Sequence, residues 1–275
     1  MGLIFDHGYL ISLHTAIEFS CAPASQPRIP STLRRIIIMD PQNIFIVGGS
    51  SGIGLEIVKK FRGNRSEIYV GSRNNESLSE YPDIHHLQMD ITEETPELSG
   101  LPEVIHGLVY CPGTIVLKPF QRLTIADFQN DYEINLLGAV KIIQSCLKKL
   151  KKSPTGASIV MFSTVAVKVG MPFHASVASA KAAVEGLVKS LAAEFAPRTR
   201  VNAIAPSLTN TPLAQSLLSS EERQKASAER HPLKRIGSPQ EIAALAQYLL
   251  TDEGSWVTGQ IFHVDWGMSS TRVFK

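Results

Sequence analysis

The sequence predicts an α/β domain in which a doubly wound parallel sheet of about seven strands is covered by helices on both faces. From Gln42 onward, short runs rich in β-branched residues alternate with helical stretches, a pattern typical of parallel sheets. A glycine-rich turn at residues 48–54 follows the first such run. The chain has 275 residues and is 44% hydrophobic, enough for one large core. The predicted architecture is therefore a three-layer Rossmann fold.

Seven runs are predicted as strands because they are short, apolar and bounded by turn residues. They are Asn43–Val47, Ile68–Gly71, His85–Asp90, Gly107–Tyr110, Ala157–Ser163, Arg200–Ala205 and Gln260–Val264.

Helices are predicted between these strands from apolar residues at helical spacing and from capping residues. Thr124 with Asp127 three residues later forms a capping box, and Ser238 followed by Pro239 marks a second helix start. The predicted helices are Gly54–Phe61, one from Thr124 to about Leu150, one over Ser176–Phe195 and one beginning after Ser238.

Composition excludes several classes of function. The net charge of +2 gives no reason to expect nucleic acid or a membrane surface as a partner, and no apolar run reaches the roughly 18 residues of a membrane span. Three cysteines without a CxxC pair indicate a reducing compartment, so we expect a cytoplasmic protein. The eight histidines lack metal-ligand spacing, and no metal site is predicted.

The first 38 residues form a separate segment. They lack a basic start followed by an apolar stretch and a cleavage site, which argues against a secretory signal. Met39 stands directly before the first predicted strand and is our preferred natural start. An organelle presequence is the alternative, because arginines outnumber acids near residues 28–35. We therefore predict an extension over 1–38, disordered or not native, and a single domain over 39–275.

The turn after the first strand reads Gly48-Gly49-Ser50-Ser51-Gly52-Ile53-Gly54 and is followed by an amphipathic helix. Glycines allow the backbone to approach a ligand closely, and a helix N-terminus offers N–H donors and partial positive charge to phosphates. This order predicts a dinucleotide site; a tight turn without a ligand is the alternative.

The residues at the end of the second strand distinguish NAD-binding from NADP-binding sites. An acidic residue there would accept hydrogen bonds from the ribose of NAD, but the strand ends in Gly71-Ser72-Arg73. An arginine pairs with a 2′-phosphate through charge-assisted hydrogen bonds. We predict NADP(H) as the cofactor, with an ordinary surface arginine as the alternative.

Beyond the glycine turn, the segment Ser163–Lys181, STVAVKVGMPFHASVASAK, resembles the active-site segment of the short-chain dehydrogenase/reductase family. The resemblance extends from about Gln42 to Gly267. It implies an oxidoreductase that assembles as a homodimer or homotetramer through its two long helices. It also implies that Lys181 holds the nicotinamide ribose, that Asn135 organises a proton relay, and that Thr164, beside Ser163, occupies the position of the catalytic serine.

The glycine turn, the second strand and the resemblance together yield the predicted site. Cofactor binding is assigned to Gly48, Ser50, Ser51, Gly52, Ile53, Gly54, Ser72, Arg73, Asp90, Ile91, Gly113, Lys181, Pro206 and Thr211, and catalysis to Asn135, Ser163, Thr164, His174 and Lys181.

The catalytic tyrosine of the family motif is missing, because Val177 stands four residues before Lys181. His174 is the candidate replacement acid. It lies seven residues before the lysine, nearly two helical turns. The enoyl-acyl-carrier-protein reductase branch of this fold carries its tyrosine at that spacing. The alternative is a histidine that caps the following helix or lines a cleft without catalytic duty.

Three functions stay open at this point. The first is an NADPH-dependent reductase that transfers hydride to a carbonyl or an activated C=C bond of a small organic substrate. The second is a catalytically inactive NADPH-binding or structural homologue, which Val177 favours. The third is a purely oligomeric role. The segment Thr211–His231 resembles the variable lid of the family, which would set the substrate.

Overall fold

The computed structural model describes residues 42–63, 65–94 and 96–272. They belong to a compact unit that spans Asp40–Lys275. The predictions made for residues 1–38 lie outside the described residues and stay predictions. No helix among the described residues is long and apolar enough to cross a membrane.

Seven parallel strands in the described residues form one sheet with the order β3-β2-β1-β4-β5-β6-β7. This confirms the predicted doubly wound sheet, and each predicted strand is present within about two residues of its expected ends. The strands are β1 (Gln42–Val47), β2 (Ser66–Ser72), β3 (Ile84–Gln88), β4 (Gly107–Tyr110), β5 (Ala157–Phe162), β6 (Thr199–Pro206) and β7 (Ile261–Val264).

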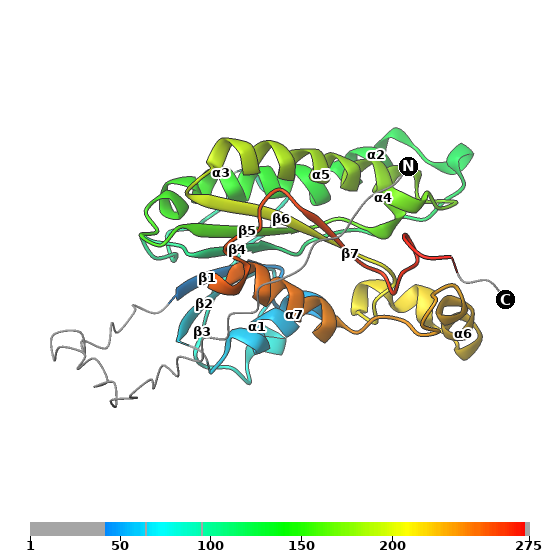
Figure 1. Ribbon diagram of the computed structural model, residues 1–275, viewed down its shortest axis with the longest axis horizontal. Helices are drawn as coiled ribbons and strands as arrows, with labels where there is room; N and C mark the ends of the chain where they lie inside the picture. Colours follow the sequence, from blue (N-terminus) through cyan, green and yellow to red (C-terminus); the bar gives the residue numbers. More distant parts are fainter. Residues whose placement is uncertain (1–41, 64, 95, 273–275) are drawn as a thin grey trace, which may run out of the picture. The chain divides into compact units, whose positions relative to one another are not determined.

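Helices cover both faces of the sheet (Figure 1). On one face lie α3 (Gly138–Lys151) and α5 (Ala175–Phe195), and on the other lie α1 (Gly52–Phe61) and α7 (Pro239–Leu250). Alternate residues of each strand enter two separate cores. In β1, for example, Phe45 belongs to the core under α3 and α5, whereas Ile44 belongs to the core under α1 and α7. This alternation explains why the strands are hydrophobic throughout.

The predicted helix from Thr124 to about Leu150 is interrupted. The capping box of Thr124 and Asp127 is present and starts α2 (Ile125–Tyr132). A π-helical turn, Glu133–Leu137, then separates α2 from α3. Such turns insert one extra residue into a helix and are frequent at functional sites. The apolar spacing of the sequence is compatible with an unbroken helix, so it did not predict the turn.

Several short helical segments were not predicted, among them α4 (Val165–Val169), the 3₁₀ segment Pro212–Leu218 and α6 (Glu221–Glu229). The first is too short to show helical periodicity, and α6 is polar on nearly all sides, so neither produces the apolar stripe on which sequence prediction relies.

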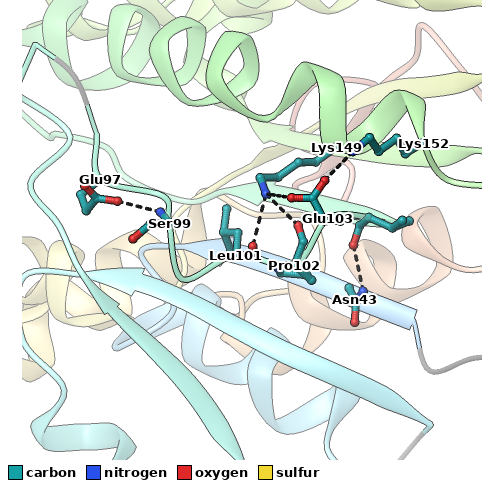
Figure 2. A network of polar contacts seen from close by, with 9 residues as sticks. Asn43, Glu97, Ser99, Leu101, Pro102, Glu103, Lys149 and Lys152 are labelled. Atoms are coloured by element: carbon teal, nitrogen blue, oxygen red, sulfur yellow. Dashed lines mark hydrogen bonds and ion pairs between the residues drawn. The ribbon is translucent and has the colours of Figure 1, made fainter.

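A polar cluster ties the end of α3 to the loop before β4 (Figure 2). Lys149 Nζ donates hydrogen bonds to the carbonyl oxygens of Leu101 and Pro102, at 3.2 and 3.0 Å. Glu103 in the same loop pairs with Lys149 and Lys152. Asn43 Nδ2 at the start of β1 donates to the Val104 carbonyl at 2.8 Å. These contacts hold the end of the sheet that lies opposite the carboxyl ends of the strands.

Candidate functional site

A cavity of about 580 Å³ opens at the carboxyl ends of the central strands. This is the edge where the chain crosses from one face of the sheet to the other between β1 and β4, and such switch points bind ligands in doubly wound folds. The predicted residues that line it are Gly48, Ser50, Ser51, Gly52, Ile53, Gly54, Ser72, Arg73, Asp90, Ile91, Gly113 and Thr211.

Two predicted cofactor residues, Lys181 and Pro206, are absent from this lining. Pro206 is the last residue of β6. Lys181 lies behind the loop that follows β4, since its Nζ would be 3.4 Å from a Cβ placed on Gly113. Lys181 therefore lies next to Gly113, which lines the cavity.

The turn between β1 and α1 requires glycine for two different reasons. Gly48 and Gly52 have φ angles of +77° and +52°, a region that favours glycine. At Gly54 a Cβ would stand 2.2 Å from the Gly48 carbonyl oxygen, so any side chain would push α1 away from the turn. Ser51 at the N-cap makes no side-chain hydrogen bond to the helix. The first N–H groups of α1 thus stay available to a phosphate at the cavity.

The rim after β2 carries both a cation and an acid. Ser72 Oγ donates to the Asn74 carbonyl at 2.6 Å and lies 2.9 Å from His86 Nε2, which holds the turn in which Arg73 stands. Arg73 is exposed and lines the cavity. Glu76, which was not predicted, lines the same cavity from the following turn.

Asp90 lies in the turn after β3, two residues beyond the end of the strand. Its Oδ1 accepts hydrogen bonds from the backbone N–H and the hydroxyl of Thr92, at 2.9 and 2.8 Å. These bonds, the backbone one foremost, lower the pKa of the Asp90 carboxyl. The carboxylate thereby shapes the turn that presents Ile91 to the cavity.

Lys181 and Asn135 meet beside Gly113. Lys181 is 7% exposed, and its Nζ donates to the Phe162 carbonyl at 2.9 Å. Burial lowers the pKa of the Lys181 ammonium to about 8. A Cβ on Gly113 would stand 3.2 Å from Asn135 Oδ1 and 3.4 Å from Lys181 Nζ, so a side chain at this position would fill the space between them. A buried cation and an amide oxygen therefore converge just behind the cavity wall.

Asn135 lies in the π-helical turn and is 1% exposed. Its Nδ2 donates to Thr114 Oγ1 at 2.7 Å and to the Asp131 carbonyl at 2.8 Å. Thr114 Oγ1 in turn donates to Asp131 Oδ1 at 2.5 Å. Neither Thr114 nor Asp131 was predicted; an aspartate one helical turn before Asn135 was the only signal for them.

The predicted hydroxyl residues are engaged elsewhere. Ser163 Oγ donates to Glu185 Oε1 at 2.6 Å. Thr164 caps α4 by accepting a hydrogen bond from the Ala166 N–H at 3.3 Å. Val177 is 5% exposed, one turn before Lys181 on α5. Neither hydroxyl residue lines the cavity at the strand ends.

His174 lines a second cavity of about 360 Å³, together with Lys118, Phe120 and Phe173. It is the N-cap residue of α5 but makes no side-chain capping bond, and its Nδ1 lies 2.7 Å from the Pro172 carbonyl oxygen. Its carbonyl oxygen accepts the first hydrogen bond of α5 from the Ala178 N–H at 2.8 Å, so His174 stands at the very start of the helix that carries Lys181. His174 is not among the residues that line the first cavity, and its role stays a prediction.

Relatives of known sequence identify the family. A family model described as enoyl-(acyl carrier protein) reductase matches residues 47–269. The 3-oxoacyl-[acyl-carrier-protein] reductase FabG of Aquifex aeolicus is 30% identical over 239 residues, covering 81% of this chain and 95% of that protein. A tropinone reductase homologue of Arabidopsis thaliana is 33% identical over 241 residues, covering 82% of this chain and 78% of that protein.

Solved structures of short-chain dehydrogenases are similar to this chain in fold. ElxO with NADP bound has a TM-score of 0.75 at 25% identity and covers 84% of this chain and 100% of its own. Ligand-free aldohexose dehydrogenase from Thermoplasma acidophilum has a TM-score of 0.75 at 25% identity, covering 85% of this chain and 96% of its own. The chain belongs to the short-chain dehydrogenase/reductase family, as its sequence motifs suggested, and is an oxidoreductase of that type.

Proposed function

We propose that this chain is an NADP(H)-dependent reductase that acts on a carbonyl or an activated C=C bond of a small organic substrate. The observation that carries the proposal is the cavity at the strand ends, which joins a glycine turn, a helix N-terminus and Arg73. The residues fit a dinucleotide, because the glycine turn places the N-terminus of α1 at the cavity and Ser51 leaves the first N–H groups of that helix without a side-chain cap. The NADP-bound relative ElxO, similar in fold, supports the choice of nucleotide.

Each part of the cavity has a role in this proposal. The first N–H groups of α1 bind the pyrophosphate, and Arg73 pairs with the 2′-phosphate. When bound, the nicotinamide supplies the hydride. Thr211 and Leu213 line the cavity on the side of the segment Thr211–His231, and Leu213 is 51% exposed. We assign that side to the substrate.

The reduction also needs a proton on the substrate, and Val177 has none to give. We assign this proton to the buried pair of Lys181 and Asn135, which lies behind Gly113. With a pKa of about 8, the Lys181 ammonium is charged at neutral pH and can release a proton without a large cost. His174 is the other donor that the sequence suggests, and it is tested separately because it lines a different cavity.

Binding isotherms with NADPH and NADH test the proposal. Arg73→Ala should weaken NADPH by about 10- to 100-fold, the value of a hydrogen bond to a charged group, and leave NADH within about threefold. Glu76→Gln is the matched control on the same rim. It removes a negative charge and should not weaken NADPH. Equal losses for both nucleotides in Arg73→Ala contradict the NADP(H) assignment, and a folded chain that binds neither contradicts the function.

We further propose that the chain is a cytoplasmic homodimer or homotetramer. The long helices α3 and α5 are the expected contact surfaces, as the family resemblance implies. Size-exclusion chromatography with light scattering measures the assembly directly, and a monomer at micromolar concentration would contradict it.

A further inference from the structure

Asp131 is a buried acid that the proposed reduction does not yet use. It lies on α2 and is 0% exposed. Its Oδ1 accepts the hydrogen bond from Thr114 Oγ1, while Oδ2 has no hydrogen-bond partner in the described part of the chain. Burying a carboxylate is costly unless it is paired. An acid kept in such a place, four residues from Asn135, indicates a role at the site.

The side chains of Asn135, Thr114 and Asp131 are linked by hydrogen bonds in which each donor and acceptor can be assigned. The Thr114 hydroxyl has one proton, and it is donated to Asp131 Oδ1. Thr114 Oγ1 therefore acts as an acceptor toward Asn135, which must present Nδ2 to it. The Asn135 Oδ1 then points the other way, toward the Thr114 N–H at 3.4 Å and the space beside Gly113. Through Thr114, the carboxylate thus supports the amide orientation that the Asp131 carbonyl and the Thr114 N–H also favour, with Oδ1 on the side of Lys181.

Asp131 also acts on Lys181 through its charge. Two titratable groups are close enough to influence the Lys181 ammonium, the Cys111 thiol at the end of β4 and the Asp131 carboxylate on α2. Burial raises the pKa of the Cys111 thiol to about 12, so this group is uncharged at neutral pH. The Asp131 charge raises the pKa of Lys181 and so opposes the effect of burial.

We propose that Asp131 is a positioning residue of the reduction site. Its carboxylate orients Asn135 through Thr114 and supplies the negative charge that keeps the Lys181 ammonium in its proton-donating form.

The proposal rests on the proposed function for the use made of that proton. Hydride adds to the substrate carbon and the electron pair of the C=O bond moves to oxygen. The Lys181 ammonium gives one proton to that oxygen, which leaves an alcohol, NADP⁺ and a neutral amine that solvent reprotonates. For a conjugated C=C bond the same proton reaches the enolate formed by hydride addition. Asn135 Oδ1 faces the space beside Gly113 and is an acceptor for the Lys181 ammonium. With the opposite amide orientation, the NH₂ group of Asn135 would face the ammonium instead.

The test follows Lys181 directly and needs no substrate. The full chain is prepared with lysine carrying ¹³C at Cε, and the Cε signal is titrated by NMR. Loss of one signal in Lys181→Arg identifies Lys181. The wild-type signal should titrate with a midpoint near 8. Asp131→Asn keeps an acceptor for Thr114 but removes the charge, so its midpoint should fall by about one pH unit. Thr114→Val, which keeps the charge, should leave the midpoint in place.

A second signal reports the orientation of Asn135. Its side-chain NH₂ protons, identified by their loss in Asn135→Ala, should exchange slowly with solvent in wild type. Slow exchange should persist in Asp131→Asn, whose amide oxygen can still accept from Thr114, and speed up at least tenfold in Thr114→Val. Circular dichroism verifies the fold of each variant. Asp131→Ser serves as a second neutral variant if Asp131→Asn does not fold.

Two results overturn the proposal. A wild-type Lys181 midpoint near 10.5, or a midpoint that is the same in wild type and the neutral Asp131 variants, removes the charge effect. Unchanged amide exchange in Thr114→Val removes the orienting effect. Failure of the proposed function shows up elsewhere, as absent NADPH binding by the wild-type chain, and does not alter the outcome of the Lys181 titration.

Discussion

The buried ammonium of Lys181 should make the stability of the fold depend on pH. The side chain is 7% exposed, and burial lowers its pKa from 10.5 to about 8. One pKa unit corresponds to about 1.4 kcal/mol, so the charged form costs about 3 kcal/mol on folding. Because the folded pKa is the lower one, this part of the stability is present above pH 10.5 and lost as pH falls through about 8.

Lys181→Met removes the titrating group and isolates this effect. Urea unfolding of wild type and variant is measured at pH 7, 8, 9 and 10. The free energy of unfolding of wild type, taken relative to the variant, should rise by about 2.5 kcal/mol over this range, most steeply between pH 8 and 10. Lys181→Met also removes the hydrogen bond to the Phe162 carbonyl, which lowers the stability of the variant by the same amount at every pH. We therefore compare how the difference in free energy of unfolding changes with pH, and not its absolute value.

Lys189 on the same helix provides the matched control. It is exposed, so Lys189→Met removes a lysine without removing a buried charge. A difference between wild type and Lys181→Met that stays flat within about 0.5 kcal/mol from pH 7 to 10 would refute the buried ammonium. The same result would also contradict the proposal that Lys181 gives the proton that the substrate needs.

Three further predictions concern the glycine turn, an exposed glycine of α5 and the second cavity. Gly54→Ala should lower NADPH affinity at least about tenfold and stability by about 1–3 kcal/mol, because its Cβ would stand 2.2 Å from the Gly48 oxygen. Gly186→Ala, where a Cβ on α5 meets nothing within 4 Å, should instead raise stability by about 0.5–1 kcal/mol, and thermal unfolding measures both. His174→Ala should cut turnover by roughly 100-fold if His174 is the acid; near-normal turnover would leave the proton with Lys181.

The strands and the cavity at their carboxyl ends could be predicted from the sequence because both depend on local pattern. A strand buried on both faces appears as a short apolar run, and the loops that line the cavity follow directly after such runs. Gly48, residues 50–54, Arg73 and Asp90 were found in this way, and all line one cavity. Glu76 was missed because it lies in the 3₁₀ turn beyond the end of β2, where no strand pattern marks it.

The arrangement around Lys181 depends on how helices pack. The π-helical turn at Asn135 and the meeting of α2 with the loop after β4 bring Asp131, Thr114 and Asn135 together. No spacing in the sequence encodes that meeting, since Thr114 and Asp131 are 17 positions apart and belong to different elements. Helical spacing also placed His174 on the Lys181 face; the structure puts His174 at the N-cap of α5, in the lining of a second cavity that the spacing did not predict.

The sequence by itself determined the doubly wound sheet, the glycine turn before α1 and the presence of valine at position 177, because each follows from consecutive residues. Only the tertiary structure decided which polar groups surround Lys181, how deeply the ammonium is buried, and that His174 faces another cavity. Those properties depend on distances between elements remote in the chain, and burial acts on a charge through every atom that displaces water from it.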